Sequence, residues 1–176
     1  MVSESGSPPI GGRFEAFSMI LLAHDDRYLL LERALTKHFA PGRWTGVGGR
    51  VEPHEFGDLH ASALRELTEE TGLDEHDIAH FAMRRLLLHN RPAEPLTLLV
   101  YFTGLLAEPT VPDCTEGTLH WVSQAEFAAL DIIENTALVL PSLIDDLTRD
   151  PSGIDRAHVG AAHYDDAGAL ERIVWA

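Results

Sequence analysis

The chain has little cysteine, little positive charge and no long apolar run. One cysteine, Cys114, among 176 residues excludes an internal disulfide and is simplest to explain by a reducing, cytoplasmic setting. Only 13 lysines and arginines oppose 28 aspartates and glutamates, so the formal net charge is −15. A chain with this charge is not expected to have the basic surface that binds duplex nucleic acid. A bound metal could still attract a small phosphorylated ligand. No apolar run reaches the roughly 18 residues of a membrane helix, and the N-terminus lacks the features of a signal peptide, so we expect no membrane association.

The composition is otherwise that of a folded domain. Apolar residues make up 45% of the chain, which suits a substantial core. We predict a flexible lead-in over residues 1–13, one domain over residues 14–149, and a C-terminal extension over residues 150–176 that packs on the domain as a hairpin.

Apolar runs bounded by turn residues predict the strands, and apolar residues at helical spacing predict the helices. Strands are expected at residues 16–23, 28–33, 82–89, 96–106, 118–122, 161–164 and 170–175, the first two and the last two forming hairpins. Helices are expected from Asp58 to Gly72, over residues 123–130, and over residues 136–147, where Pro141 either kinks or divides the helix. This order predicts an α+β or α/β sandwich with a mixed sheet.

The most highly charged stretch is residues 65–73, RELTEETGL. In a helix, Glu66, Glu69 and Glu70 lie at i, i+3 and i+4, so their carboxylates share one face, which we expect to point outward beside the apolar stripe. Such carboxylates repel by a few tenths of a kcal/mol per pair, roughly, and a hard divalent cation would reverse that cost. The alternative is a solvated acidic face that binds nothing.

Two further regions offer candidate ligand contacts. Residues 36–44 form a loop before the acidic stretch, and residues 45–51 alternate glycine with small residues, as in a short strand that another group approaches closely. The loop either contacts an anion and a flat ring or is a surface loop anchored by a tryptophan. Arg43 and Trp44 are the candidate substrate contacts of this loop. The candidates for stacking on or hydrogen-bonding a base, each with a structural role as the alternative, are Phe39, Trp44, Glu134 and Asn135.

The stretch around these residues resembles the box of the Nudix hydrolase family, Gx5Ex7REUxEExGU, where U is aliphatic. Residues 65–73 match every specified position, and Gly49 and Glu55 match the glycine and the first glutamate. Nine residues, 56–64, separate Glu55 from Arg65, where the family pattern has seven. We place the two extra residues between Glu55 and the start of the helix, where added length costs little.

The resemblance implies an α/β/α sandwich in which the box forms a loop–helix–loop. It implies that Glu69 and Glu70 ligate Mg²⁺ or Mn²⁺, that Glu66 is a ligand or the general base, and that Gly49 offers its carbonyl to the metal. Arg65 would orient a glutamate, and Glu116 matches a distal glutamate that binds a further metal or acts as the base.

The leading hypothesis is therefore a metal-dependent pyrophosphohydrolase acting on a nucleoside diphosphate linked to another group. The approach to the box, GRWTGVGGRVE, is most similar to enzymes that cleave oxidised purine nucleoside triphosphates to a monophosphate and pyrophosphate. ADP-ribose, dinucleoside polyphosphates and nucleotide sugars remain open as substrates. The alternatives of other classes are a Nudix-like module that binds a nucleotide without hydrolysing it, and an isomerase that would need a cysteine and a glutamate. The protein is expected to be a monomer or a homodimer.

Overall fold

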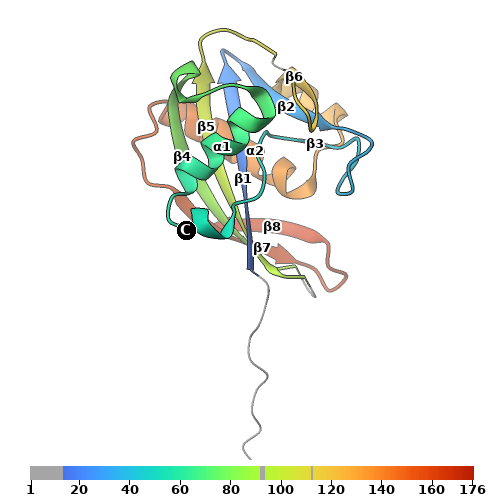
Figure 1. Cartoon of the computed structure of the whole chain (residues 1–176). Coiled ribbons are helices and arrows are strands. Elements are labelled where there is room, and N and C mark those ends of the chain that lie inside the picture. The colour runs from blue at the N-terminus through green and yellow to red at the C-terminus, as the bar shows by residue number, and fades with distance from the viewer. Residues whose placement is uncertain (1–13, 92–93, 112) are drawn as a thin grey trace, which may run out of the picture.

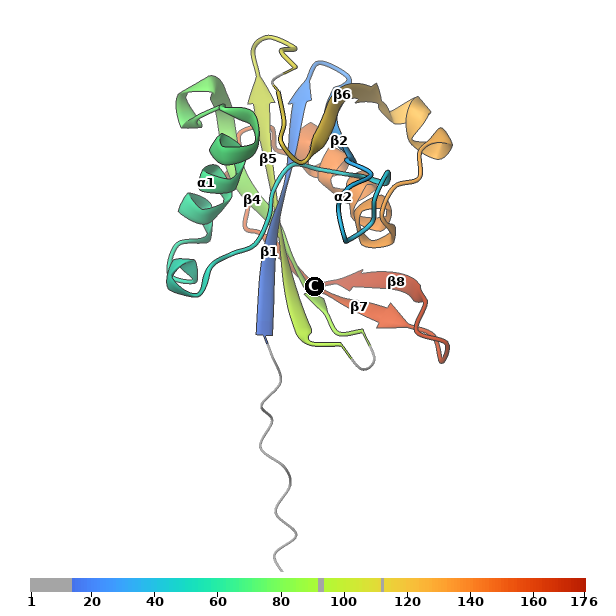
Figure 2. The ribbon, with the colours of Figure 1, turned by 45° about the vertical axis from the view of Figure 1, so that its right-hand side comes forward.

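A mixed sheet between two helices forms the body of the protein (Figure 1). The computed structural model describes residues 14–91, 94–111 and 113–176, so the predicted lead-in lies outside the described residues. Helix α1 (Leu59–Thr71) covers one face of the sheet and helix α2 (Glu134–Arg149) covers the other (Figure 2). The α/β/α sandwich expected from the resemblance is thus confirmed.

The sheet runs in the order β3–β2–β1–β5–β4–β7–β8, and β6 also pairs with β2. The β1–β5 and β4–β7 pairs are parallel and the other pairs are antiparallel. The strands are β1 (Phe14–His24), β2 (Arg27–Arg33), β3 (Trp44–Thr45), β4 (Ile78–His89), β5 (Leu96–Leu106), β6 (Gly117–Ser123), β7 (His158–Tyr164) and β8 (Leu170–Trp175). Three short 3₁₀ helices, η1 (Pro53–Glu55), η2 (Glu75–Asp77) and η3 (Gln124–Ala129), lie between them.

The central strand β1 is apolar because both of its faces are covered. Ile20 and Leu22 belong to the core under α1, whereas Leu21 and Ala23 belong to the core under α2. Alternate residues of a strand point to opposite faces, so a strand between two helices needs apolar residues at successive positions. The uninterrupted apolar run in the sequence has this cause.

The predicted elements exist, with differences at their bounds; strands β1 and β7 begin two and three residues before the predicted residues 16 and 161, at Phe14 and His158. Strand β4 begins at Ile78, whereas the prediction began at residue 82. Between Ala79 and Ala82 the register with β5 shifts, and His80 has a φ of 57°. This irregularity breaks the alternation on which the prediction depended. Helix α2 continues through Pro141 as one helix and begins at Glu134, earlier than predicted.

The C-terminal hairpin adds two strands to the same sheet through the β4–β7 pair. Its last strand covers a buried ion pair between Arg85 and Asp146, in which Nε and Nη2 donate to the two carboxylate oxygens at 2.7 and 2.8 Å. The Trp175 ring lies over the Arg85 guanidinium, with 4.7 Å from Cζ to the ring centroid. Among the described residues, none of the helices is both long and apolar enough to cross a membrane.

Candidate active site

Helix α1 has clear signals at both ends, which fix where its acidic residues lie. The Asp58 carboxylate accepts the amide of Ala61 at 3.0 Å at the N-terminus. Gly72 ends the helix with a φ of 72°, and its amide donates to the carbonyl of Thr68 at 2.8 Å. Both ends are where the sequence predicts them.

Glu70 is not on an outward face, which corrects one expectation from the sequence. It is 8% exposed, and its Oε2 accepts the amide of Gly48 at 3.0 Å. Burial, together with the charges of Glu116 and Glu66, raises the pKa of Glu70 to about 7 despite that hydrogen bond. The apolar stripe of α1 is broad enough to bring the end of its acidic face under the glycine-rich loop.

Glu66 also points toward that loop. Its side chain is 15% exposed, and burial is the main reason why its pKa is raised. Gly49 lies against it so closely that a Cβ at this position would collide with the Glu66 carboxylate. The Gly49 carbonyl, predicted as a metal ligand, accepts the amide of Ser18 at 2.8 Å, so it takes part in a backbone hydrogen bond between the loop and β1.

Arg65 holds Glu55 in a bidentate pair, rather than one of the three helical glutamates. Its Nε and Nη2 donate to the two oxygens of Glu55 at 2.6 and 2.9 Å. Its Nη1 lies 3.0 Å from oxygens of both Glu66 and Glu69. The guanidinium therefore joins the first glutamate of the box to the helix, which shows the structural role of Glu55 despite the extra residues.

Glu69 is the most solvent-exposed of the three helical carboxylates, with 59% of its side chain exposed. Within the described ranges, its Oε2 has Arg65, at the helical i, i+4 spacing, as its one hydrogen-bond partner. It can thus reorient toward a cation at little cost.

Glu116 approaches this group from the loop before β6. Its charge contributes to the raised pKa of Glu70, and its Oε1 accepts Nζ of Lys37 at 2.5 Å. The charge of Arg33, at the end of β2, acts on Glu70 in the opposite direction. Sequence reasoning did not identify Arg33, although a charged residue at the end of an apolar strand is the available signal.

An open groove of about 440 Å³ lies beside Glu116. Arg33 and Leu35 line one side, and Cys114 and Thr118 line the other. Burial is the main cause of a raised pKa for the Cys114 thiol, while the amides of Glu116 and Gly117 act against it. The groove has room for part of a small-molecule substrate next to the carboxylates.

None of the predicted substrate contacts forms a described hydrogen bond or ion pair with Glu66, Glu69 or Glu70. Arg43 donates to both oxygens of Glu134 at 3.0 and 3.1 Å, so these two residues form an ion pair with each other. Trp44 packs on the α2 side of the sheet, Asn135 donates to the Tyr101 hydroxyl at 3.3 Å, and Phe39 is 68% exposed. Their roles as base contacts stay predictions.

The donor set of the site fits a hard divalent cation. Glu66, Glu69 and Glu70 supply carboxylate oxygens, the ligands that Mg²⁺ and Mn²⁺ prefer. Among the described residues, no three histidine, cysteine or acidic side chains are already gathered at ligand distance. The Nη1 of Arg65 bridges Glu66 and Glu69, and the Gly48 amide donates to Glu70 at 3.0 Å.

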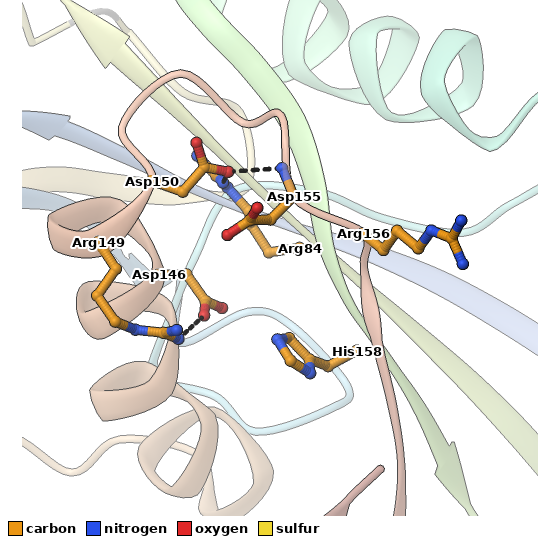
Figure 3. Close-up of a pocket in the computed structure, with 7 residues that line it drawn as sticks. All are labelled: Arg84, Asp146, Arg149, Asp150, Asp155, Arg156 and His158. Carbon is orange, nitrogen blue, oxygen red and sulfur yellow. Dashed lines mark hydrogen bonds and ion pairs between the residues drawn. The ribbon is translucent and has the colours of Figure 1, made fainter.

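A second cavity lies on the α2 side, where α2 passes into the C-terminal hairpin (Figure 3). Its volume of about 10 Å³ suits one water molecule and no substrate. Arg84 is 4% exposed there, and within the described part of the chain its Nη2 has no hydrogen-bond partner. A bound water would satisfy this donor.

The sandwich, the loop–helix–loop and its grouped carboxylates define a Nudix-type domain. A family model of the NUDIX domain matches residues 12–143, so the chain belongs to this family, as the resemblance in the sequence predicted.

Three known proteins illustrate the relationship. The chain is 34% identical over 128 residues to an isopentenyl-diphosphate Delta-isomerase from Streptomyces avermitilis; the match covers 68% of this chain and 62% of the relative. The chain thus spans less than two thirds of that relative. A MutT protein from Bacillus halodurans shares the fold with a TM-score of 0.59 at 18% identity, over 92% of this chain and 97% of the other. A bifunctional NMN adenylyltransferase/ADP ribose pyrophosphatase from Francisella tularensis, in a complex with AMP and a Mn ion, also shares the fold. Its TM-score is 0.60 at 19% identity, and the match covers 77% of this chain and 42% of the other.

Proposed function

We propose that this protein is a metal-dependent pyrophosphohydrolase that cleaves the diphosphate linkage of a nucleoside diphosphate joined to another group. The observation that supports the proposal most directly is the carboxylate group of α1. Glu70 and Glu66 are held under a glycine loop with raised pKa values, and Arg65 ties the helix to Glu55. A solvated acidic face would show none of these features.

The exposure and charge of the side chains suggest which residues would bind the metal and which would bind phosphate. Glu66, Glu69 and Glu70 would hold Mg²⁺ or Mn²⁺, which when bound neutralises the diphosphate and makes a nearby water a stronger acid. Arg33 and Lys37, at the edge of the groove, would bind phosphate oxygens that the cation leaves free.

A carboxylate has to take a proton from the attacking water. Glu66 is one candidate base, in place of its role as a ligand, and burial is the main reason why its pKa is raised. Glu116 is the second candidate base, because its carboxylate is free to leave Lys37 once a phosphate binds that ammonium.

Turnover of purified protein with Mg²⁺ or Mn²⁺ tests the proposal. The panel comprises oxidised and ordinary purine nucleoside triphosphates, ADP-ribose, a dinucleoside polyphosphate and a nucleotide sugar, with release of phosphate or pyrophosphate as the readout. Glu66→Gln and Glu70→Gln should each lower kcat by about 100-fold or more, whereas Glu108→Gln, in an exposed loop, should not. Absence of turnover for every diphosphate would refute the hydrolase, and tight binding without turnover would favour the nucleotide-binding module.

Among these substrates we propose a purine nucleoside triphosphate, on the similarity of the segment before the box. A preference for an oxidised base would appear as a higher kcat/KM for the oxidised than for the ordinary nucleotide. If ADP-ribose or a nucleotide sugar has the highest kcat/KM, the triphosphate assignment is wrong and the hydrolase class stands.

A second candidate, isomerisation of isopentenyl diphosphate, is favoured by one observation. Cys114 lines the groove, and the charges of Glu70 and Glu116 act on its thiol, so the cysteine and glutamates that an isomerase would need lie together. Incubation with isopentenyl diphosphate and product analysis by NMR tests this candidate. The isomerase candidate requires that wild type gives an isomerised product and that Cys114→Ala gives none.

A further inference from the structure

A buried arginine lies where α2 passes into the C-terminal hairpin, and one of its donors is unused. The Arg84 side chain is 4% exposed. Its Nε donates to the Thr103 hydroxyl at 2.7 Å, and its Nη1 donates to the Asp150 carboxylate at 3.0 Å. Within the described residues, its Nη2 has no hydrogen-bond partner. Because an unpaired charged donor is costly at this depth, the cavity beside Nη2 is suited to hold an acceptor.

An irregularity in β4 places two consecutive arginines on the α2 side of the sheet. The register between β4 and β5 shifts between Met83 and Arg85. Residues of a regular strand alternate between the two faces, and such a shift lets neighbours point the same way. Arg85 pairs with Asp146 inside α2, whereas Arg84 pairs with Asp150 at the C-terminal end of the helix. Arg84 is thus held at the point where the helix ends and the connection to the hairpin begins.

The connection from α2 to β7 closes over Arg84. Gly153 has a φ of 72°, and a Cβ at this position would collide with the Ala82 side chain and lie 3.5 Å from Nη2 of Arg84. Glycine is therefore needed for the connection to approach β4. The cavity, with a volume of about 10 Å³, has room for one oxygen atom, and the space that opens from it to solvent brings the total to about 260 Å³. One oxygen of a larger group fits inside, while the rest of the group would lie in the opening.

Basic side chains surround the opening of the cavity. Arg149 and Arg156 are exposed, and the half-buried His158 ring extends from β7 toward α2 (Figure 3). Arg156 points into solvent in this view, from where it can turn toward the opening. Three of the chain's 13 lysines and arginines thus line one small cavity, although the net charge of the protein is −15. This concentration of donors favours an anion over a neutral acceptor.

Two of the three aspartates that line the cavity are already paired. Both oxygens of Asp146 accept from Arg85, at 2.7 and 2.8 Å. The Oδ2 of Asp150 accepts from Arg84 and from the amide of Asp155, the latter at 2.9 Å. Asp155 itself is exposed, so its carboxylate stays hydrated at little cost. Its carboxylate is the alternative partner of Nη2.

We propose that this cavity is a binding site for a small tetrahedral oxyanion such as inorganic phosphate, on the opposite face of the sheet from the α1 carboxylates. One oxygen would accept Nη2 of Arg84, and the other oxygens would face Arg149 and His158 at the opening. Bonds from a guanidinium to an oxyanion are stronger than those to a neutral acceptor, so the anion should displace a water from the cavity. Once bound, it would join β4, α2 and the first residue of the hairpin.

Thermal unfolding of the full chain with inorganic phosphate tests the proposal. EDTA keeps metal away, so that the α1 carboxylates repel the anion, and sodium chloride holds the ionic strength constant. When phosphate is at about twenty times its dissociation constant, the melting temperature should be higher by about 4–7 °C. In proton–nitrogen NMR spectra, the Nε–H signal of Arg84 should shift over the same range of phosphate concentrations.

Substitutions in the cavity and a matched control localise the site. Arg149→Gln should weaken phosphate binding about tenfold, because it removes a charged donor at the opening. Arg172→Gln, which changes an exposed arginine in β8 of the same hairpin, should leave binding unchanged. Arg84→Lys keeps the charge beside Asp150 but lacks the second NH₂ group, so it should weaken binding by about tenfold or more. Arg149→Gln keeps the test available if Arg84→Lys does not fold.

Four results would overturn the inference. An equal rise in melting temperature in every variant would be the general stabilisation that phosphate gives to folded proteins. No rise up to about 50 mM phosphate would show that the cavity binds no oxyanion with useful affinity. A rise that Lys37→Gln abolishes would place the anion in the groove beside Glu116. A rise in Asp155→Asn but not in wild type would identify the Asp155 carboxylate as the partner of Arg84.

Discussion

Replacing Glu55 by glutamine removes the charge that holds Arg65 in place. The carboxylate accepts Nε and Nη2 of Arg65, and it also accepts the Ser62 hydroxyl at 2.7 Å and the Glu52 amide at 2.8 Å. A glutamine keeps the shape, but its NH₂ group faces donors that need an acceptor. The substitution should therefore loosen the start of α1 from the loop that precedes it.

The pKa of Glu55 gives the size of the effect. Hydrogen bonding to Arg65 is the main cause that lowers the pKa from 4.5 to about 2. At about 1.4 kcal/mol per pKa unit this would correspond to at most about 3.5 kcal/mol. Because the Arg65 side chain is 31% exposed, solvent weakens the pair, and we expect a loss of about 1–3 kcal/mol in the free energy of unfolding. The melting temperature should fall by about 4–8 °C for a loss of 2 kcal/mol.

The effect should depend on pH with a definite sign. The folded-state pKa of Glu55 is lowered, so its contribution is present above about pH 4.5 and is lost as the pH falls toward 2. Wild type and Glu55→Gln should thus differ fully above about pH 5 and become similar only near pH 2.

Urea unfolding at about pH 7, 4 and 2.5, which spans the window between the two pKa values, measures the difference. Glu15→Gln is the control, because Glu15 pairs with Arg50 at 3.1 Å but the Arg50 side chain is 55% exposed, so the change should cost no more than about 0.5 kcal/mol. A Glu55→Gln penalty below about 0.5 kcal/mol at pH 7, or one that does not change with pH, would refute the reasoning.

Three further predictions follow from other parts of the structure. Glu70 has a raised pKa of about 7, so the metal-free protein should lose about 1–3 kcal/mol in the free energy of unfolding as the pH rises from 4.5 through 7. In urea unfolding, Glu70→Gln should remove this dependence on pH, and an unchanged dependence contradicts the assignment. Gly49→Ala should lower turnover about 100-fold because its Cβ displaces a carboxylate, whereas Gly57→Ala, with nothing within 4 Å, should not; equal activities would be inconsistent with this. Trp175→Ala should cost about 2 kcal/mol in thermal unfolding by uncovering the buried guanidinium beneath it, whereas Val174→Ala should cost less than about 0.5; similar losses would show that the ring contributes little.

The elements of the fold could be read from the sequence because their signals are local. Asp58 and Gly72 mark the ends of α1, and the apolar runs mark the central strands. Strand order could not be read, since β1 pairs in parallel with β5, far along the chain. The C-terminal hairpin was predicted, but its partner strand β4 was not.

The carboxylates of the site could be named from the sequence, but their environments could not. Helical spacing places Glu66, Glu69 and Glu70 on one face and says nothing of what covers that face. The Gly48 amide that donates to Glu70 comes from the loop after β3, and the charge of Arg33 comes from the end of β2, so both are distant from Glu70 in the sequence. Arg43 was predicted as a substrate contact of the loop and Glu134 as a base contact, and the ion pair they form depends on how α2 docks against the loop.

The two extra residues before α1 leave the group around Arg65 together. The Arg65–Glu55 pair keeps the box together, so the added length is taken up between Glu55 and the first turn of the helix. That segment has contacts of its own: the Phe56 ring lies 5.5 Å from the Phe14 ring between centroids, and the Asp58 carboxylate caps α1 by accepting the amide of Ala61 at 3.0 Å. The segment is therefore anchored at both ends, to β1 and to the helix, and the extra length does not reach Glu66, Glu69 or Glu70.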